Sequence, residues 1–193
     1  MKSIAVFCGS SSGFNSIYET FAQELGAYMA KNQISLVFGG GQVGLMGAVA
    51  NASLAENGKV IGLIPHFLNL KEVAHTGVSE LISVDSMHER KAKIYEISDG
   101  FIILPGGFGT CDEMFEILTW GQLGLHGKPV GVLNINGFYD HLIVHFENMV
   151  KEGFLNAQNK DAILISDSIP DLIEMMENYK PKSVIKWLSR EQV

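Results

Sequence analysis

The sequence predicts a single α/β domain of the doubly wound type, in which helices cover both faces of a mainly parallel sheet. Short apolar runs alternate with segments whose apolar residues recur at helical spacing, and most runs end in glycine, serine or proline. Such alternation indicates strands joined by helical crossovers, which place the strands parallel. The chain has 193 residues, of which 47% are apolar and 21 are glycine, and this length suits one well-packed core.

The first part of the chain contains strand and helix patterns in strict alternation. Residues 4–8 form an apolar run that ends in glycine and serine, and helical spacing follows over residues 16–31. Residues 34–38 form the next run, before a glycine cluster and a helix of small residues that ends near Glu56. Residues 60–64 then predict a third strand.

The regular pattern lapses after Pro65 for about a dozen residues, and irregular loops of this length often belong to a functional site. A strand resumes over residues 78–84. Ser86 and Glu89 then have the spacing of a capping box, which predicts that a helix begins there and runs to about Ile97.

The second half of the chain repeats the alternation of strands and helices. The predicted elements are a strand over residues 100–104, a helix from the PGGFGTCDE segment to about Leu125, a strand over residues 130–133, a helix over residues 139–151, a strand over residues 162–165 and a helix over residues 170–178. An amphipathic tail of about residues 179–193 follows. Neither a linker nor a repeat divides the chain, so we expect residues 1–193 to form one doubly wound, Rossmann-like domain, a fold that commonly binds nucleotides.

Charge and cysteine content exclude several classes of protein. Lys and Arg number 14 against 21 Asp and Glu, a formal net charge of −7 without a basic cluster, which disfavours nucleic acid and anionic membranes as partners. The apolar run at residues 4–8 is too short for the core of a signal peptide. Cys8 and Cys111 form neither a CxxC pair nor a disulfide framework, so we expect a reducing, cytoplasmic location.

Glycine-rich loops follow several predicted strands, at the edge of the sheet where doubly wound proteins bind ligands. Gly39-x-Gly41-x-x-Gly44 formally matches the dinucleotide fingerprint, but the following strand does not end in the acidic residue that would hold a ribose. NAD binding is therefore disfavoured. Two interpretations stay open for this loop: Gly44 and Gly47 allow close packing of helix on sheet, or the loop approaches a ligand through its backbone.

The segment PGGFGT follows the most apolar strand and opens a helix. Gly106, Gly107 and Gly109 let backbone N–H groups turn toward an anion at the positive end of that helix, with the Thr110 hydroxyl as a further donor. The segment lacks the lysine and the spacing of a Walker loop. It therefore favours binding of a phosphate or phosphoribose group over a merely tight turn.

Glu113 has two interpretations at this stage. Thr110 and Glu113 fit a capping box, with Thr110 as N-cap. Alternatively, Glu113 is a carboxylate one turn beyond the phosphate site, where it could face the sugar of a nucleotide and assist cleavage at the anomeric carbon. Glu116 lies one turn further on and could bind the ribose.

The PGGFGTCDE segment and the upstream Met87-His88-Glu89-Arg90-Lys91 segment resemble the PGGxGTxxE and MHxRK motifs of the lonely guy (LOG) family, long labelled lysine decarboxylases. The resemblance covers about residues 1–155. It implies cleavage of the N-glycosidic bond of cytokinin riboside 5′-monophosphate, an N6-modified AMP, or of AMP itself. The products would be the free base and ribose 5-phosphate.

The resemblance also implies a site. Arg90 and Glu113 would be the catalytic pair, with Glu113 stabilising the oxocarbenium-like sugar and orienting water, and Arg90 positioning phosphate or Glu113. Neither a metal nor a redox cofactor is required. The implied substrate-binding residues are Glu72, Arg90, Lys91, Gly106, Gly107, Phe108, Gly109, Thr110, Cys111, Asp112, Glu113 and Thr119.

Other residues receive a weaker interpretation. A nucleophilic role for Cys111 lacks a partner base, and His141 with His145 lacks a clustered third metal ligand. Met46, Met87 and Met114 fit core positions, or with Phe108 an apolar rim for a prenyl group. Apolar residues on more than one face of the predicted helices suggest a homodimer, and they are Phe115, Leu118, Trp120 and Leu123.

A rival from another class is a non-catalytic protein that carries or senses a nucleotide or the molybdenum cofactor. A carrier needs the phosphate loop, whereas this chain also retains Arg90 and Glu113, which favours catalysis. Lysine decarboxylation is disfavoured, because the chain lacks a lysine in a recognisable pyridoxal-phosphate context.

Overall fold

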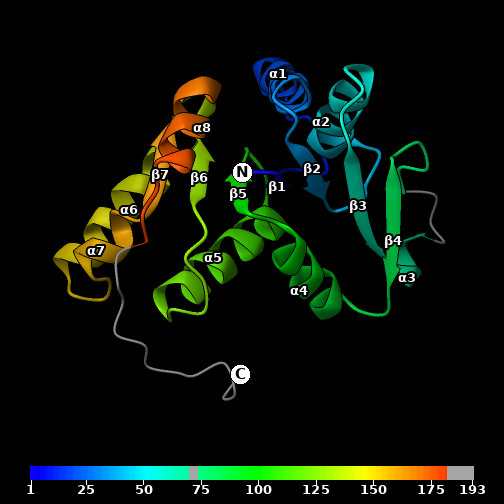
Figure 1. Cartoon of the computed structure of the whole chain (residues 1–193). Helices are drawn as coiled ribbons and strands as arrows, with labels where there is room; N and C mark the ends of the chain where they lie inside the picture. The colour runs from blue at the N-terminus through cyan, green and yellow to red at the C-terminus, as the bar shows by residue number, and fades with distance from the viewer. Residues whose placement is uncertain (70–73, 182–193) are drawn as a thin grey trace.

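The computed structural model describes residues 1–69 and 74–181 and confirms the doubly wound architecture (Figure 1). Within these residues, seven strands form one sheet in the order β4-β3-β2-β1-β5-β6-β7. Every neighbouring pair is parallel. The strands are β1 (Ser3–Phe7), β2 (Ser35–Phe38), β3 (Val60–Pro65), β4 (Glu80–Val84), β5 (Gly100–Ile103), β6 (Val130–Leu133) and β7 (Ile163–Ser166).

The order of strands reverses between β1 and β5. From β1 the chain builds outward to β4 at one edge, then returns to place β5 on the other side of β1 and continues to β7. The carboxyl ends of β1 and β5 therefore flank the switch point, where doubly wound sheets bind their ligands.

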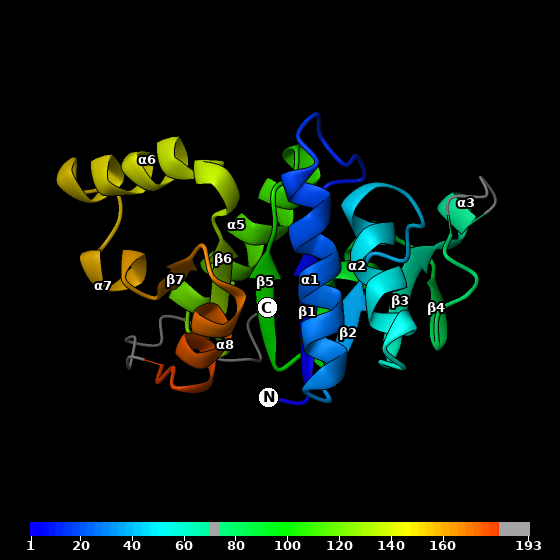
Figure 2. The ribbon, with the colours of Figure 1, turned by 90° about the horizontal axis from the view of Figure 1, so that it is seen from above.

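Helices cover both faces of the sheet, as Figure 2 shows from above. Side chains of α1, α2 and α8 pack on one face and those of α4, α5 and α6 on the other. The main helices are α1 (Ile17–Lys31), α2 (Gly44–Ala55), α4 (Met87–Ile97), α5 (Phe108–Gln122), α6 (Asp140–Lys151) and α8 (Ile169–Glu177).

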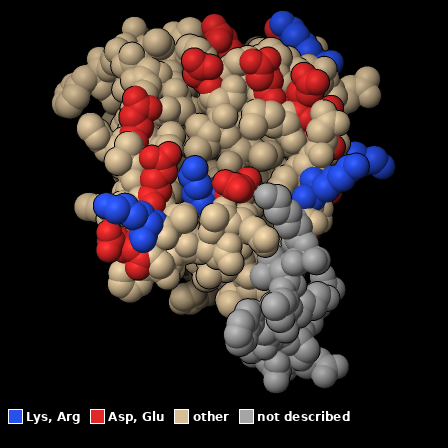
Figure 3. Space-filling view, turned by 90° about the vertical axis from the view of Figure 1, so that its left-hand side faces the viewer, with Lys and Arg blue, Asp and Glu red and all other residues tan. Residues whose placement is uncertain are grey.

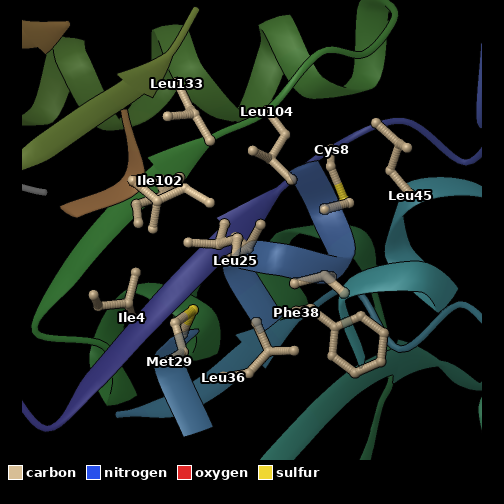
Figure 4. Close-up of a cluster of buried hydrophobic side chains, with 14 of the residues drawn as sticks. Ile4, Cys8, Leu25, Met29, Leu36, Phe38, Leu45, Ile102, Leu104 and Leu133 are labelled. Atoms are coloured by element: carbon tan, nitrogen blue, oxygen red, sulfur yellow. The ribbon is translucent and has the colours of Figure 1, made fainter. Parts of the chain in front are cut away.

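The core on the α1 side is built from alternate strand residues. Ile4, Leu36 and Ile102, from three neighbouring strands, are fully buried. They lie in one cluster with Leu25 and Met29 of α1 (Figure 4). This packing holds β1 and β5 rigidly, and with them the loops that leave their carboxyl ends.

Three one-turn elements were missed by the sequence analysis: α3 (His66–Asn69), a 3₁₀ turn over Ile135–Gly137, and α7 (Ala157–Lys160). A single turn is too short to show helical periodicity. In α7 the Asn156 side chain accepts a hydrogen bond from the Gln158 N–H at 2.9 Å. The expected amphipathic tail lies almost wholly outside the described residues.

The expected start of α4 is confirmed. Ser86 Oγ accepts a hydrogen bond from the Glu89 N–H at 3.1 Å. The Glu89 carboxylate accepts from the Asp85 N–H at 2.7 Å, one residue before the position that a capping box uses. This cap fixes the first turn of α4, which carries Arg90.

The surface of the protein shows the excess of acidic residues expected from the net charge of −7. In Figure 3, acidic side chains outnumber basic ones, and the basic ones lie scattered rather than in a patch on the face shown. In the part of the chain that the structure describes, no helix is long and apolar enough to cross a membrane.

Candidate active site

The loops after β1, β2 and β5 meet at the switch point. The Gly9 N–H donates to the Pro105 carbonyl at 3.0 Å, and the Leu45 N–H donates to the Gly9 carbonyl at 3.1 Å. These bonds join the glycine-rich loops that the sequence analysis singled out into one cluster at the carboxyl edge of the sheet.

Gly44 and Gly47 serve close packing, one of the two interpretations left open for this loop. Gly44 has a φ of +62°, and a Cβ there would overlap the backbone of Ser10 and Ser11. A Cβ at Gly47 would overlap the Gln42 carbonyl. Both glycines therefore let the start of α2 press against neighbouring backbone.

The PGGFGT segment is open where an anion would approach. A Cβ added at Gly107 or Gly109 would meet none of the described residues within 4 Å. Phe108 is 95% exposed. Gly107 is the N-cap of α5 and makes no side-chain cap hydrogen bond, so the first-turn N–H groups of a 15-residue helix lack a capping side chain. Such a helix end attracts phosphate.

The expected capping box at Thr110 is wrong. α5 begins at Phe108, two residues earlier, so Thr110 lies inside the first turn and is buried. The extended backbone of Gly107 starts the helix without a side-chain cap. Glu113 is therefore not used in capping, which leaves the interpretation in which its carboxylate faces the site.

Arg90 and Glu113 come together although 23 residues separate them in sequence. Arg90 Nη2 donates to Glu113 Oε1 at 2.6 Å, and their side chains are 12% and 11% exposed. Burial raises the pKa of the Glu113 carboxyl, while the charges of Arg90 and Lys91 partly offset that rise. The result is a shielded carboxylate that accepts a proton more readily than an exposed one.

Lys91 lies on the neighbouring side of α4 and pairs with two acids of α5. Its Nζ is 2.8 Å from Asp112 Oδ2 and 3.3 Å from Glu116 Oε1. Partial burial lowers the pKa of Lys91, but the hydrogen bonds and charges of these two acids outweigh it and raise the pKa overall. Lys91 therefore stays cationic beside the Arg90–Glu113 pair.

The other predicted substrate residues lie along α5, with one exception. Asp112 and Thr119 are exposed and Cys111 is half-buried. Thr119 is six residues beyond Glu113, about 9 Å further along the helix axis. Glu72 lies outside the described residues.

The methionines that flank the motifs divide into two groups. Met114 is fully buried in the core under α5. Met46 and Met87 are half-buried, and Arg90 Nη1 donates weakly to Met87 Sδ at 3.8 Å. This contact could have been predicted from the sequence, because Met87 lies three residues before Arg90 on one helix.

Cys8 is a site neighbour that the sequence analysis did not assign. Burial, with a further contribution from the Glu113 charge, raises the pKa of its thiol. Cys8 is thus an uncharged group close to the carboxylate. Its position directly after β1, at the switch point, was the signal that could have found it.

The remaining candidates are two histidines and two cysteines. His141 and His145 are exposed on α6, and Cys8 and Cys111 carry free thiols. Among the described residues, no group of three or more His, Cys, Asp or Glu side chains is placed to hold a metal ion.

A hollow of about 480 Å³ lies at the loops that follow β1 and β2 and along helices α1 and α2. Its lining is about equally polar and apolar, and Glu19 is the charged residue among the described lining residues. The lining residues are Ser12, Glu19, Gln23, Gln42, Gly44, Gly47, Ala48, Asn51 and Ala52. Among the described residues, the hollow shares none with the predicted substrate set.

Known proteins resemble this chain over most of its length. A family model described as "Possible lysine decarboxylase" matches residues 46–176. Cytokinin riboside 5′-monophosphate phosphoribohydrolase LOG2 of Arabidopsis thaliana is 42% identical over 181 residues, covering 94% of this chain and 85% of that protein. Probable cytokinin riboside 5′-monophosphate phosphoribohydrolase LOGL9 of Oryza sativa subsp. japonica is 44% identical over 180 residues, covering 93% and 79%.

A solved structure resembles the fold at lower identity. The molybdenum cofactor binding protein from the phototrophic bacterium Rippkaea orientalis superposes with a TM-score of 0.68 and 22% identity, covering 91% of this chain and 94% of that chain. At this identity the likeness concerns the arrangement of strands and helices and says nothing about ligands.

Proposed function

The chain belongs to the lonely guy (LOG) family, and we propose on that basis that it hydrolyses the N-glycosidic bond of cytokinin riboside 5′-monophosphate and of AMP. The products are the free base and ribose 5-phosphate. The observation that carries this proposal is the Arg90–Glu113 contact at 2.6 Å, shielded from solvent and one turn beyond an open helix N-terminus.

The nucleotide is proposed to lie along α5. Its 5′-phosphate binds the N–H groups at the start of the helix, around Gly107 and Gly109, with Lys91 as the nearby cation. Glu113 follows Gly109 by about one turn, roughly 6 Å along the axis, and this spacing supports a position of its carboxylate beside the ribose. The base then extends toward Thr119.

Hydrolysis breaks the bond between C1′ and the purine nitrogen, and the bonding electrons leave with the base. The sugar gains oxocarbenium character, which the negative charge of Glu113 stabilises. Glu113 takes a proton from water as the water oxygen bonds to C1′, and a proton from solvent neutralises the departing purine. Arg90 keeps Glu113 oriented and favours its ionised form.

The carrier rival is tested by chromatography of purified protein mixed with AMP or with isopentenyl-AMP. We expect release of adenine or isopentenyladenine in proportion to enzyme and time, and the ratio of the two rates reports substrate preference. Tight binding of nucleotide with no base released would instead support the non-catalytic carrier.

We expect the acid limb of the pH profile of kcat/KM to report Glu113. Burial raises the pKa of Glu113. As the pH is lowered, kcat/KM should therefore begin to fall at a higher pH than it would with an ordinary carboxyl group. Lys91 lowers this pKa, and Lys91→Gln should therefore move the limb to higher pH. Lys93→Gln, on the same helix and paired with Glu96, is the control. An unmoved limb in Lys91→Gln would contradict the assignment.

We further propose that the protein works as a homodimer in a reducing, cytoplasmic environment. Trp120 packs on Tyr95 and Phe115 on Phe146, yet Phe115 stays 38% exposed. The two free thiols suit a reducing compartment. Light scattering at micromolar concentration should give twice the chain mass of 21.1 kDa, and a mass of one chain would refute the dimer.

A further inference from the structure

Gly39, the first residue after β2, lies against the Arg90 guanidinium. A Cβ built on Gly39 would be 2.6 Å from Arg90 Nη2, 3.2 Å from Arg90 Cζ and 3.3 Å from Met46 Sδ. The space that any side chain at position 39 would need is therefore already filled by the guanidinium. We propose that Gly39 is a positioning residue for the hydrolysis, which seats Arg90 so that it reaches Glu113; this inference rests on the proposed function.

Space, rather than backbone conformation, explains a glycine at this position. The φ of Gly39 is outside the left-handed region, whereas its neighbour Gly40 has a φ of +74° and needs glycine for that reason. A residue with a Cβ could adopt the backbone conformation of Gly39. The obstacle to a side chain there is therefore steric overlap with neighbouring atoms. Arg90 is the nearest such neighbour.

The position of the Arg90 guanidinium depends on the space beside Gly39, because few hydrogen bonds to described residues hold it. Among residues 1–69 and 74–181, Nη2 contacts Glu113 at 2.6 Å, and Nη1 has only the Met87 sulfur as a partner, at 3.8 Å. Arg90 Nε is buried and has no hydrogen-bond partner in the described part of the chain. With so few directional contacts, the position of the guanidinium is set largely by the walls around it.

A methyl group at position 39 would displace Arg90. Ordinary contact begins near 3.4 Å, so Nη2 has to retreat by about 0.8 Å from the 2.6 Å position. A displacement of about 1 Å at a reacting centre typically costs ~10²-fold in rate. We therefore expect Gly39→Ala to lower kcat by about 10²-fold and to change KM far less.

A double-mutant cycle tests whether Gly39 acts through Arg90. Gly39→Ala is measured in the wild type and in Arg90→Ala, by single-turnover release of adenine from AMP. The wild type should lose activity as above, and the Arg90→Ala background should lose less than about twofold, because the space is empty there. Equal losses in both backgrounds, or full activity of Gly39→Ala, would overturn the proposal. Gly121→Ala, whose Cβ first meets the His126 ring at 3.4 Å, is the matched control.

A second readout does not depend on hydrolysis. The pKa of Glu113 is followed by NMR of its carboxyl carbon in wild type, Gly39→Ala and Arg90→Ala. Arg90 lowers this pKa, so both variants should raise it, whereas Gly121→Ala should not. An unchanged Glu113 pKa in Gly39→Ala would contradict the proposal that Gly39 positions Arg90, even if the enzyme is active. Absence of base release by the wild type, with the pKa shift present, would instead refute the proposed function alone.

Discussion

Glu113→Gln is expected to lower the rate of base release from AMP by about 10³-fold or more. Glutamine keeps the size of the side chain and an oxygen that can accept from Arg90 Nη2. It lacks the negative charge that we propose stabilises the sugar cation, and it cannot take a proton from water. Chemistry is therefore lost while the nucleotide still binds.

The measurement is a time course of adenine release under excess enzyme, with AMP affinity determined separately by calorimetry. Glu96→Gln, an exposed residue of α4 paired with Lys93, removes one negative charge away from the site and should keep the wild-type rate. A Glu113→Gln variant that retains a tenth of the wild-type rate would remove Glu113 from the mechanism.

Arg90→Ala is expected to lower kcat by about 10²- to 10³-fold. The sequence left two roles open for this residue, positioning the phosphate or positioning Glu113. The contact at 2.6 Å with a carboxylate that is 11% exposed favours the second role. Loss of Arg90 leaves Glu113 buried without its closest cation, which favours the protonated, inactive form.

The two roles of Arg90 are separated by kinetics and by rescue. Loss of a Glu113 partner lowers kcat, whereas loss of a phosphate ligand chiefly raises KM. Added methylguanidinium should restore part of the rate of Arg90→Ala and leave the wild type unchanged. A variant with normal kcat and a raised KM would assign Arg90 to phosphate binding.

The fold was predictable because each strand is a short apolar run bounded by glycine, serine or proline. In a sheet covered on both faces, such runs are the expected signal. The predicted strands at residues 60–64 and 130–133 match β3 and β6 closely. One-turn elements such as α3 and α7 escaped, because a single turn has no periodicity to detect.

The residues of the site could be predicted from the sequence, but the contacts between them could not. Motifs identified Arg90 and Glu113, yet their approach depends on how α4 and α5 pack, which no local pattern encodes. The predicted Thr110 capping box was wrong because the helix starts from a glycine N-cap, Gly107, three residues earlier. In the sequence, Gly39 looked like part of a dinucleotide fingerprint. Its proximity to the Arg90 guanidinium depends on how α4 packs against the end of β2, which the sequence pattern does not show.

The placement of α4 has a consequence for how the protein gains activity as it folds. α4 contacts β1, β2, β3 and β4, so it lies across one entire half of the sheet. Its partner α5 follows β5, on the far side of β1. Arg90 meets Glu113 only after both halves have joined, a late event that depends on contacts distant in sequence. Recovery of enzymatic activity during refolding therefore marks completion of the whole sheet, and should lag behind recovery of helical circular dichroism.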